Sequence, residues 1–348
     1  ESMKILPAKN TPVDTRNRPL RDLRISVTDR CNFRCTYCMP AEIFSEKYEF
    51  LPRRDLLTFE EIERLVRVFA ELGVSKLRIS GGEPLLRSHV DDLILQLSSI
   101  EGIADTALTT NATLLPRMAD KLRKAGLGRL TVSLDSLDDA VFRKMNGDKL
   151  SPAEVLEGIV AAEAAGFTQL KINCVVQKGV NDHTIVDLAR HFRGSGHILR
   201  FIEYMDVGTR NDWNLEQVMS LDEIVDAIGQ DFPLIPLEPN HIGEVAKRWE
   251  YADGQGEIGI ITSVSKPFCG DCSRARLTTD GTLVTCLFAN SGTDLRGPMR
   301  DGASDEELFE LISGIWSART DRYSEERGQM TDAARQDRAR MEMYQLGG

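Results

Sequence analysis

Three cysteines lie within eight positions near the start of the chain, in the stretch CNFRCTYC. Cys31, Cys35 and Cys38, here called the first thiol set, have the spacing C-x3-C-x2-C. A tetrahedral metal site needs four ligands, whereas this stretch offers three thiolates. Three thiolates can hold a [4Fe–4S] cluster by three of its irons and leave the fourth iron open to a reacting ligand. The alternative is a structural zinc site that a distant Cys or His completes.

A second group of three cysteines lies far along the chain. Cys269, Cys272 and Cys286, here called the second thiol set, have the spacing C-x2-C-x13-C. None of the five histidines lies within this stretch, and a zinc ribbon short of one ligand is the alternative. The seventh cysteine, Cys174, shares the parity of its apolar strand neighbours. We therefore expect it to be buried as a small hydrophobic residue.

The elements that must position these thiols are strand-like runs alternating with helical patterns. Helices are expected over 58–73, 114–126 and 152–166, and the last two end at a glycine. The alternation predicts a parallel sheet, either an open doubly wound sheet or an incomplete β/α barrel. The strands are expected at residues 23–28, 76–80, 106–110, 130–135, 170–176 and 198–205.

Four of these strands alternate apolar with polar residues, which favours the barrel. A parallel strand buried on both faces would read as a continuous apolar run. Successive side chains point to opposite faces of a strand, so each of the four has an apolar face for helices and a polar face. We expect a lumen that holds a charged ligand; solvent-exposed edge strands are the alternative. The cations of polar parity are Arg24, Lys76, Arg78 and Lys171.

Two loops that follow neighbouring strands carry the residues best suited to chemistry. The first thiol set follows the first strand, and residues 81–84, GGEP, follow the second. The site of a β/α barrel lies at the C-terminal ends of its strands. We therefore expect the cysteine loop and the glycine-rich loop at one mouth of the barrel.

The chain beyond about residue 240 changes to short strands and turns, with a hairpin expected at Asp280-Gly281. We expect four parts, with the barrel followed by a smaller unit that carries the second thiol set. Their bounds are 1–20 for an N-terminal tail, 21–240 for the barrel, 241–329 for the second unit and 330–348 for a C-terminal tail.

Composition narrows the class of protein. The net charge of −11 argues against nucleic-acid binding, and no apolar run approaches the roughly 20 residues of a membrane helix. The first residues lack the apolar core of a signal peptide, and closely spaced thiols in odd number favour a reducing cytoplasm. Met3 is a candidate native start, with Glu1 and Ser2 left over from cloning.

Several motifs together resemble a known family. CNFRCTYC after a strand, with Tyr37 before its third cysteine, and GGEP after the next strand resemble the radical S-adenosylmethionine (SAM) enzymes. Both thiol sets, RARLT after Cys272, RFIEYMDVG at the sixth strand and the terminal Gly-Gly resemble the family of molybdenum cofactor biosynthesis protein A, the GTP 3′,8-cyclases. This resemblance covers residues 15–348.

The resemblance implies a fold and a reaction. The fold is an incomplete (β/α)6 TIM-like barrel with a C-terminal α+β extension. The first thiol set would hold the SAM cluster, and the second an auxiliary [4Fe–4S] cluster that contacts the guanine base. A 5′-deoxyadenosyl radical would take hydrogen from ribose C3′ of GTP, and C3′ would then bond to guanine C8. The product is (8S)-3′,8-cyclo-7,8-dihydroguanosine 5′-triphosphate, in the first step of molybdenum cofactor biosynthesis.

The resemblance also implies residue roles. The residues expected at SAM are Tyr37, Gly81, Gly82, Glu83, Asn111, Ser133 and Met205. Those expected at GTP are Arg24, Lys76, Arg78, Thr109, Lys171, Arg200, Arg274 and Arg276. The tail residues Gly347 and Gly348 are expected to reach into the active site.

The expected partners are an electron donor such as flavodoxin or ferredoxin, the next enzyme of molybdopterin synthesis and a second copy of the chain in a homodimer. Three alternatives remain. One is a peptide-modifying radical SAM enzyme with an auxiliary Fe–S cluster, and another is a zinc-binding scaffold without catalysis. The third, a nucleotide-binding regulator, is disfavoured because the sequence has no P-loop.

Overall fold

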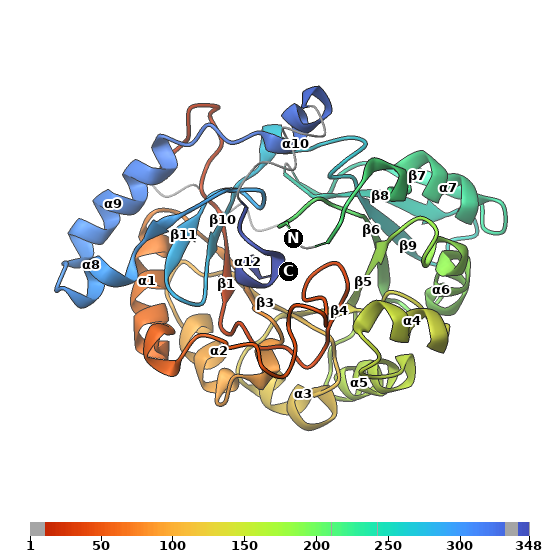
Figure 1. Cartoon of the computed structure of the whole chain (residues 1–348), viewed down its shortest axis with the longest axis horizontal. Helices are drawn as coiled ribbons and strands as arrows, with labels where there is room; N and C mark the ends of the chain where they lie inside the picture. Colours follow the sequence, from red (N-terminus) through yellow and green to blue (C-terminus); the bar gives the residue numbers. More distant parts are fainter. Residues whose placement is uncertain (1–10, 210, 242, 331–339, 348) are drawn as a thin grey trace.

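A sheet of twelve strands organises the part of the chain that the structure describes (Figure 1). The computed structural model describes residues 11–209, 211–241, 243–330 and 340–347. Neighbouring strands from β1 to β6 are all parallel, and they curve into a partial barrel with helices on the outside. These strands are β1 (Asp22–Ser26), β2 (Lys76–Ser80), β3 (Asp105–Thr110), β4 (Arg129–Ser133), β5 (Lys171–Val176) and β6 (Ile198–Glu203).

The predicted helices are confirmed, with ends that differ by one or two residues. A capping box at Thr58 begins the first, and Gly126 and Gly166 follow the ends of two others with φ of +92° and +91°. Glycine tolerates this left-handed backbone because it has no Cβ. The barrel helices are α1 (Phe59–Glu71), α2 (Val90–Ser98), α3 (Leu115–Lys124), α4 (Asp139–Asn146), α5 (Pro152–Ala164) and α6 (Ile185–Phe192).

The C-terminal region extends both edges of the barrel sheet. Strand β9 (Glu257–Ile261) pairs parallel to β6, and β10 (Arg274–Leu277) pairs parallel to β1. Strand β11 (Thr282–Val284) returns antiparallel to β10, which confirms the hairpin expected at Asp280-Gly281. The expected boundary at residue 240 falls between the paired strands β7 and β8, and the division into domains stays a prediction. Beyond β6 the other strands and α-helices are α7 (Leu221–Gly229), β7 (Leu234–Leu237), β8 (Ala246–Tyr251), β12 (Thr293–Asp294), α8 (Arg296–Arg300), α9 (Asp305–Ser317), α10 (Tyr323–Glu326) and α12 (Met343–Leu346).

Short 3-10 helices interrupt the loops between these elements. They are η1 (Arg53–Asp55), η2 (Pro84–Leu86), η3 (Asp182–Thr184), η4 (Leu215–Gln217), η5 (Cys269–Asp271) and η6 (Arg327–Gln329). No helix in the described part of the chain is both long and apolar enough to cross a lipid bilayer.

The alternation along the strands has the predicted consequence for their two faces. Leu23 and Ile25 of β1 are at most 1% exposed and belong to the core that the barrel helices cover. Cys174 of β5 is fully buried in the same core, as expected. The polar parity faces the lumen, where Arg24 pairs in register with Arg78 on one side and Arg276 on the other. The strands therefore place a row of cations inside the barrel.

Candidate functional site

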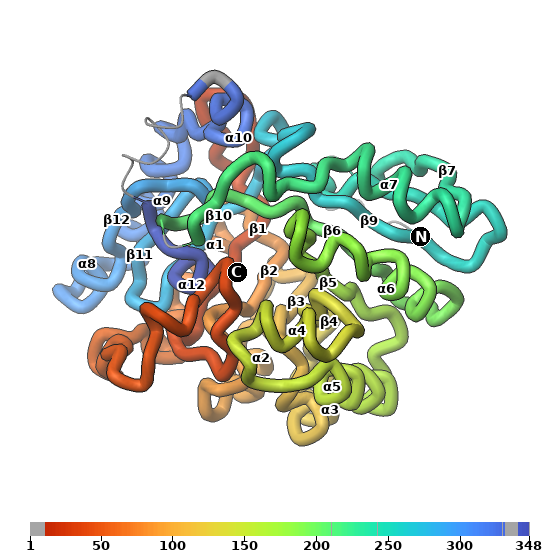
Figure 2. Tube along the Cα trace, turned by 45° about the vertical axis from the view of Figure 1, so that its right-hand side comes forward, coloured from red at the N-terminus to blue at the C-terminus, as the bar shows by residue number. Residues whose placement is uncertain are grey.

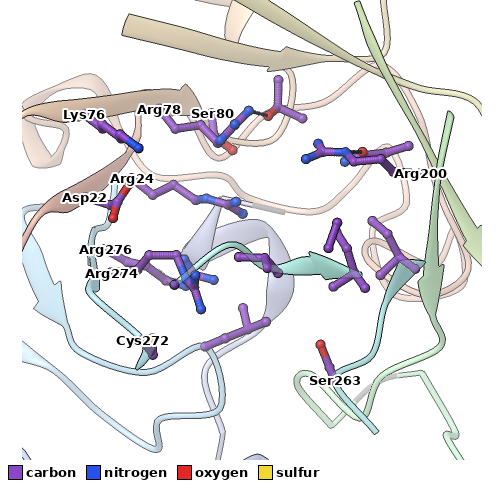
Figure 3. Close-up of a pocket in the computed structure, with 18 of the residues that line it drawn as sticks. Asp22, Arg24, Lys76, Arg78, Ser80, Arg200, Ser263, Cys272, Arg274 and Arg276 are labelled. Carbon is purple, nitrogen blue, oxygen red and sulfur yellow. Dashed lines mark hydrogen bonds between the residues drawn. The ribbon is translucent and has the colours of Figure 1, made fainter. Parts of the chain in front are cut away.

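One large cavity of about 1410 Å³ fills the barrel lumen. Both thiol sets line it, together with every residue that the sequence analysis expected at SAM or GTP. Figure 3 shows how Arg24, Arg78 and Arg200 project into the space between strands. The structure thus brings the predicted site residues together, and their individual roles stay predictions.

The two thiol sets lie at opposite ends of a pair of neighbouring strands. The first set follows the C-terminal end of β1. Cys269 and Cys272 precede the N-terminal end of β10, which runs parallel to β1 with Asp22 opposite Arg274. Arg24 and the cations opposite it in register, Arg78 and Arg276, form a row across the strands, between the two thiol sets.

The loop of the first thiol set is braced from both sides. Arg34 donates from Nε to the carbonyl of Phe44 (2.7 Å) and from Nη1 to that of Cys31 (2.7 Å). The Tyr37 hydroxyl donates to Oδ2 of Asp135 on the barrel (2.8 Å). These bonds hold the three thiols at the barrel mouth before any ligand binds.

Burial raises the pKa of each thiol in the first set. Carboxylates add to the effect, with Glu83 beside Cys31 and Asp135 beside Cys35. The pKa of Cys31 reaches about 12. A soft cation is therefore needed to stabilise three thiolates here, because metal ligation requires deprotonated sulfur.

The two glycines of the GGEP loop pack against neighbouring backbone too closely for a side chain. A Cβ on Gly82 would lie 2.2 Å from the carbonyl oxygen of Arg30, and Gly81 has φ of +155°. Glu83 is 1% exposed and accepts from Thr110 Oγ1 (2.8 Å) and from the Asn111 amide (2.8 Å). Burial nevertheless raises the pKa of Glu83 to about 7. The loop therefore combines close packing against the backbone that precedes the first thiol set with one buried carboxyl group, at residues that the sequence analysis expected at SAM.

The second thiol set has cationic rather than acidic neighbours. Burial alone would raise the pKa of Cys272, but Arg274 and Arg319 outweigh it and bring that pKa to about 7. Burial and Asp321 raise the pKa of Cys286 to about 11. This end of the lumen therefore favours a thiolate more strongly than the other end does.

The donor sets suit clusters rather than one shared ion. In the described ranges, no three His, Cys, Asp or Glu side chains converge where a single metal ion could bind. In an iron–sulfur cluster each thiolate binds a different iron, so the sulfurs need not converge on one point. Two sets of three thiols on the wall of one cavity therefore fit two clusters, each with one iron left without a protein thiolate.

The lumen cations repel one another because few anions face them. Burial lowers the pKa of Arg24 well below its usual range, and Arg276, Arg78, Arg274 and Arg200 lower it further. Burial, Arg78 and Arg129 bring the pKa of Arg200 to about 9. Arg276 is 7% exposed, and its Nε and Nη1 have no hydrogen-bond partner among the described residues. An anionic ligand would relieve this repulsion and satisfy these donors.

The C-terminal segment enters the barrel mouth (Figure 2). The carbonyl of Gly347 accepts from Nη1 of Arg24 (2.9 Å), and a Cβ on Gly347 would lie 2.9 Å from Ser80 Oγ. The hydroxyls of Tyr344 and Tyr48 lie 3.0 Å apart. The prediction for Gly347 agrees with this position, whereas Gly348 lies outside the described residues.

Several residues that line the cavity were not predicted as site residues, and three of them contact predicted ones. Asp135 and Asn173 line the cavity, and Asn173 Oδ1 accepts from Nε of Arg200 (2.9 Å). Both have the polar parity of their strands, which could have identified them. Arg319 donates to the sulfur of Cys272 (3.3 Å) but lies beyond α9, where no local pattern points to it.

Comparisons with known proteins agree with this geometry. The profile of the radical SAM superfamily matches residues 25–192, and that of Molybdenum Cofactor Synthesis C matches residues 197–325. The chain is 51% identical over 335 residues to a GTP 3′,8-cyclase of Xanthomonas axonopodis pv. citri, covering 96% of this chain and 98% of that protein. It is 49% identical over 336 residues to one of Staphylococcus saprophyticus, with the same coverage.

A solved structure shares the fold. Streptococcus suis SuiB bound to S-adenosylmethionine superposes with a TM-score of 0.59 at 17% identity, covering 94% of this chain and 74% of that one. This likeness supports the fold alone, a radical SAM partial barrel with a C-terminal extension.

Proposed function

The chain belongs to the GTP 3′,8-cyclase family of radical SAM enzymes, and we propose that its barrel lumen is where GTP is cyclised in the first step of molybdenum cofactor biosynthesis. The observation that carries this proposal is the row of buried, mutually repelling cations between two sets of three thiols. A triphosphate with about four negative charges is the kind of ligand that such a row requires.

The first thiol set would hold the [4Fe–4S] cluster to which SAM binds. When bound, this pair supplies the one-electron chemistry that removes a hydrogen atom, which no side chain can do. The protein provides the residues that bind SAM. Gly81 and Gly82 let this loop pack against the backbone of Thr28 and Arg30 beside the first thiol set, and the Glu83 carboxylate can accept from an ammonium group. Tyr37, Asn111, Ser133 and Met205 line the same cavity and would complete the SAM site.

The lumen cations would bind and orient the triphosphate. Arg78 is held by the hydroxyls of Thr109 and Thr131, each 3.0 Å from its Nη1, and Arg200 is held by Asn173. Guanidinium groups fixed in this way lose little entropy when phosphate oxygens bind, so they can set the position of the ribose. The other cations in this role would be Arg24, Lys76, Lys171, Arg274 and Arg276.

The second thiol set would hold the auxiliary [4Fe–4S] cluster, with its open iron toward guanine. In a GTP molecule held by cations between the two thiol sets, the ribose would face the first set and the guanine base would face the second. The Gly347 carbonyl on Arg24 supports a part for the C-terminal tail in enclosing this site and excluding water.

The peptide-modifying alternative would share the barrel and an auxiliary cluster. It would not require so many cations on the lumen wall, and this favours the nucleotide. A flavodoxin or ferredoxin as electron donor, transfer of the product to the next enzyme of molybdopterin synthesis, a homodimer and a cytoplasmic location all stay predictions.

The decisive experiment is anaerobic reconstitution followed by addition of SAM and a strong reductant, with and without GTP. Formation of 5′-deoxyadenosine that depends on GTP, with an equal amount of cyclised product, is the expected result. Slow formation that is indifferent to GTP would move the substrate elsewhere, toward a peptide. No 5′-deoxyadenosine from protein loaded with iron and sulfide would refute the proposal.

A further inference from the structure

A buried ionic network stands behind the second thiol set. Asp14, which is 5% exposed, pairs with Nε of Arg18 (2.6 Å) and with Nη1 of Arg319 (3.3 Å). Arg18 and Arg319 are 2% and 5% exposed. Three charged side chains buried together are rare in proteins unless they are paired and hydrogen-bonded, as they are here.

Both arginines also reach the cysteine pair. Arg18 donates from Nη1 to the carbonyl of Cys269 (2.8 Å). Arg319 donates from Nη1 to the carbonyl of Cys272 (2.8 Å) and from Nη2 to its sulfur (3.3 Å). The two arginines thus share an aspartate and both donate to the cysteine loop, but among the hydrogen bonds of the described residues only Arg319 reaches a sulfur there.

The guanidinium of Arg319 is held in place before any ligand binds. It lies 4.5 Å from the ring centroid of Trp316, a 1% exposed residue of α9 whose indole donates to the carbonyl of Arg18 (3.0 Å). The Nε atom of Arg319 lies 3.3 Å from Oδ2 of Asp321, a side chain that is 32% exposed. A donor fixed in this way imposes little ordering cost on the sulfur that it contacts.

The first thiol set has the opposite electrostatic surroundings. Carboxylates, not guanidiniums, are the main charged neighbours of its sulfurs, namely Glu83, Asp135 and Glu342. Reduction of a cluster adds one negative charge, which a donor to sulfur stabilises and a nearby carboxylate opposes. The two ends of the lumen therefore favour opposite charge states.

We propose that Arg319 is a positioning residue for the second cluster, where its hydrogen bond to the Cys272 sulfur raises the reduction potential. The proposal rests on the proposed function, in which the second thiol set holds a [4Fe–4S] cluster. A one-electron reductant then reduces this cluster more readily than it reduces the first.

The test uses the full chain with Cys31, Cys35 and Cys38 replaced by alanine, so that every cluster signal belongs to the second set. Iron and acid-labile sulfide are measured first, and the cluster is then titrated electrochemically and followed by electron paramagnetic resonance. In this background Arg319→Gln should lower the equilibrium constant for reduction about tenfold, a shift of about 59 mV for one electron. Arg319→Lys, which keeps the charge, should recover most of this loss.

Arg18→Gln is the matched control, because Arg18 shares Asp14 but contacts a carbonyl. It should shift the equilibrium constant by less than threefold. Equal potentials for Arg319→Gln and the parent would overturn the role of Arg319, and so would an equal shift in Arg18→Gln. If Arg319→Gln does not retain iron, Arg319→Met is titrated in its place, and a potential equal to that of the parent would overturn the role of Arg319. A parent without iron and sulfide would instead overturn the cluster assignment itself, and the inference with it.

Discussion

Replacement of Arg200 by methionine tests whether the lumen cations are a binding site rather than a structural feature. Arg200 lies on β6, and its Nε donates to Asn173 Oδ1 (2.9 Å). No salt bridge of Arg200 is found in the described ranges, and burial with Arg78 and Arg129 nearby brings its pKa to about 9. Methionine keeps the bulk of the side chain while it removes the charge and the donors.

The Arg200 variant is expected to lose affinity for GTP without losing stability. A charge-assisted hydrogen bond is worth about 1.5–3 kcal/mol, so the affinity for GTP should fall about 10- to 150-fold. Stability should not fall with it. The lost bond to Asn173 costs about 1 kcal/mol, and relief of repulsion from the other lumen cations offsets this cost.

The assay measures GTP affinity by anaerobic calorimetry and the free energy of unfolding by denaturant titration. The matched control is the double variant Arg129→Met with Asp105→Asn, which removes an arginine of the same lumen together with its ion-pair partner. The control should bind GTP within about threefold of the parent but lose up to about 1 kcal/mol of stability. The reasoning is refuted if the Arg200 variant binds GTP as well as the control does, or if it unfolds more easily than the control.

The remaining predictions concern the loops, the tail and pH. Gly82→Ala should abolish SAM binding in a calorimetric titration because its Cβ would overlap a backbone carbonyl, whereas Gly314→Ala, in open space on a helix, should bind SAM normally and gain up to about 1 kcal/mol of stability. Deletion of residues 347–348 should lower turnover without lowering cluster content, since it removes the contact with Arg24; full turnover would contradict this. Burial and neighbouring arginines lower the pKa of Lys171 to about 8, and a bound triphosphate would raise it again. The affinity for GTP should therefore decrease from pH 7 to pH 9. If the affinity of Lys171→Met depends on pH as steeply as that of the parent, another group titrates.

The barrel could be predicted because its signals are local. Alternation within five or six residues identified the lumen face of four strands, and a terminal glycine identified the ends of two helices. The attachment of β9 to one edge of the sheet and β10 to the other could not be predicted in this way. Strand β10 pairs with β1 across about 250 positions of sequence, and periodicity carries no information on such a partner.

The site residues also fall into those that local sequence patterns predict and those that they do not. Arg24 and Arg78 could be predicted from parity, and the thiols from their spacing. Arg319 could not, since its aspartate lies 305 positions away and its position depends on how α9 ends against the N-terminal segment. Asp135 had the correct parity, but only its bond with Tyr37 reveals that it braces the cysteine loop.

The arrangement of charge gives the lumen a direction. Carboxylates lie near the first thiol set, the Arg24 row occupies the middle, and Arg319 faces the second set. The cations in the middle of the lumen would attract the phosphates of an anionic substrate, and the carboxylates near the first thiol set would repel them. We therefore expect the phosphates to stay in the cationic stretch, while only the neutral ribose and base extend toward the clusters. Because strand register aligns Arg24 with Arg78 and Arg276, this confinement is built into the sheet before substrate binds. We therefore expect substrate orientation to follow from the same alternation of side chains that forms the barrel.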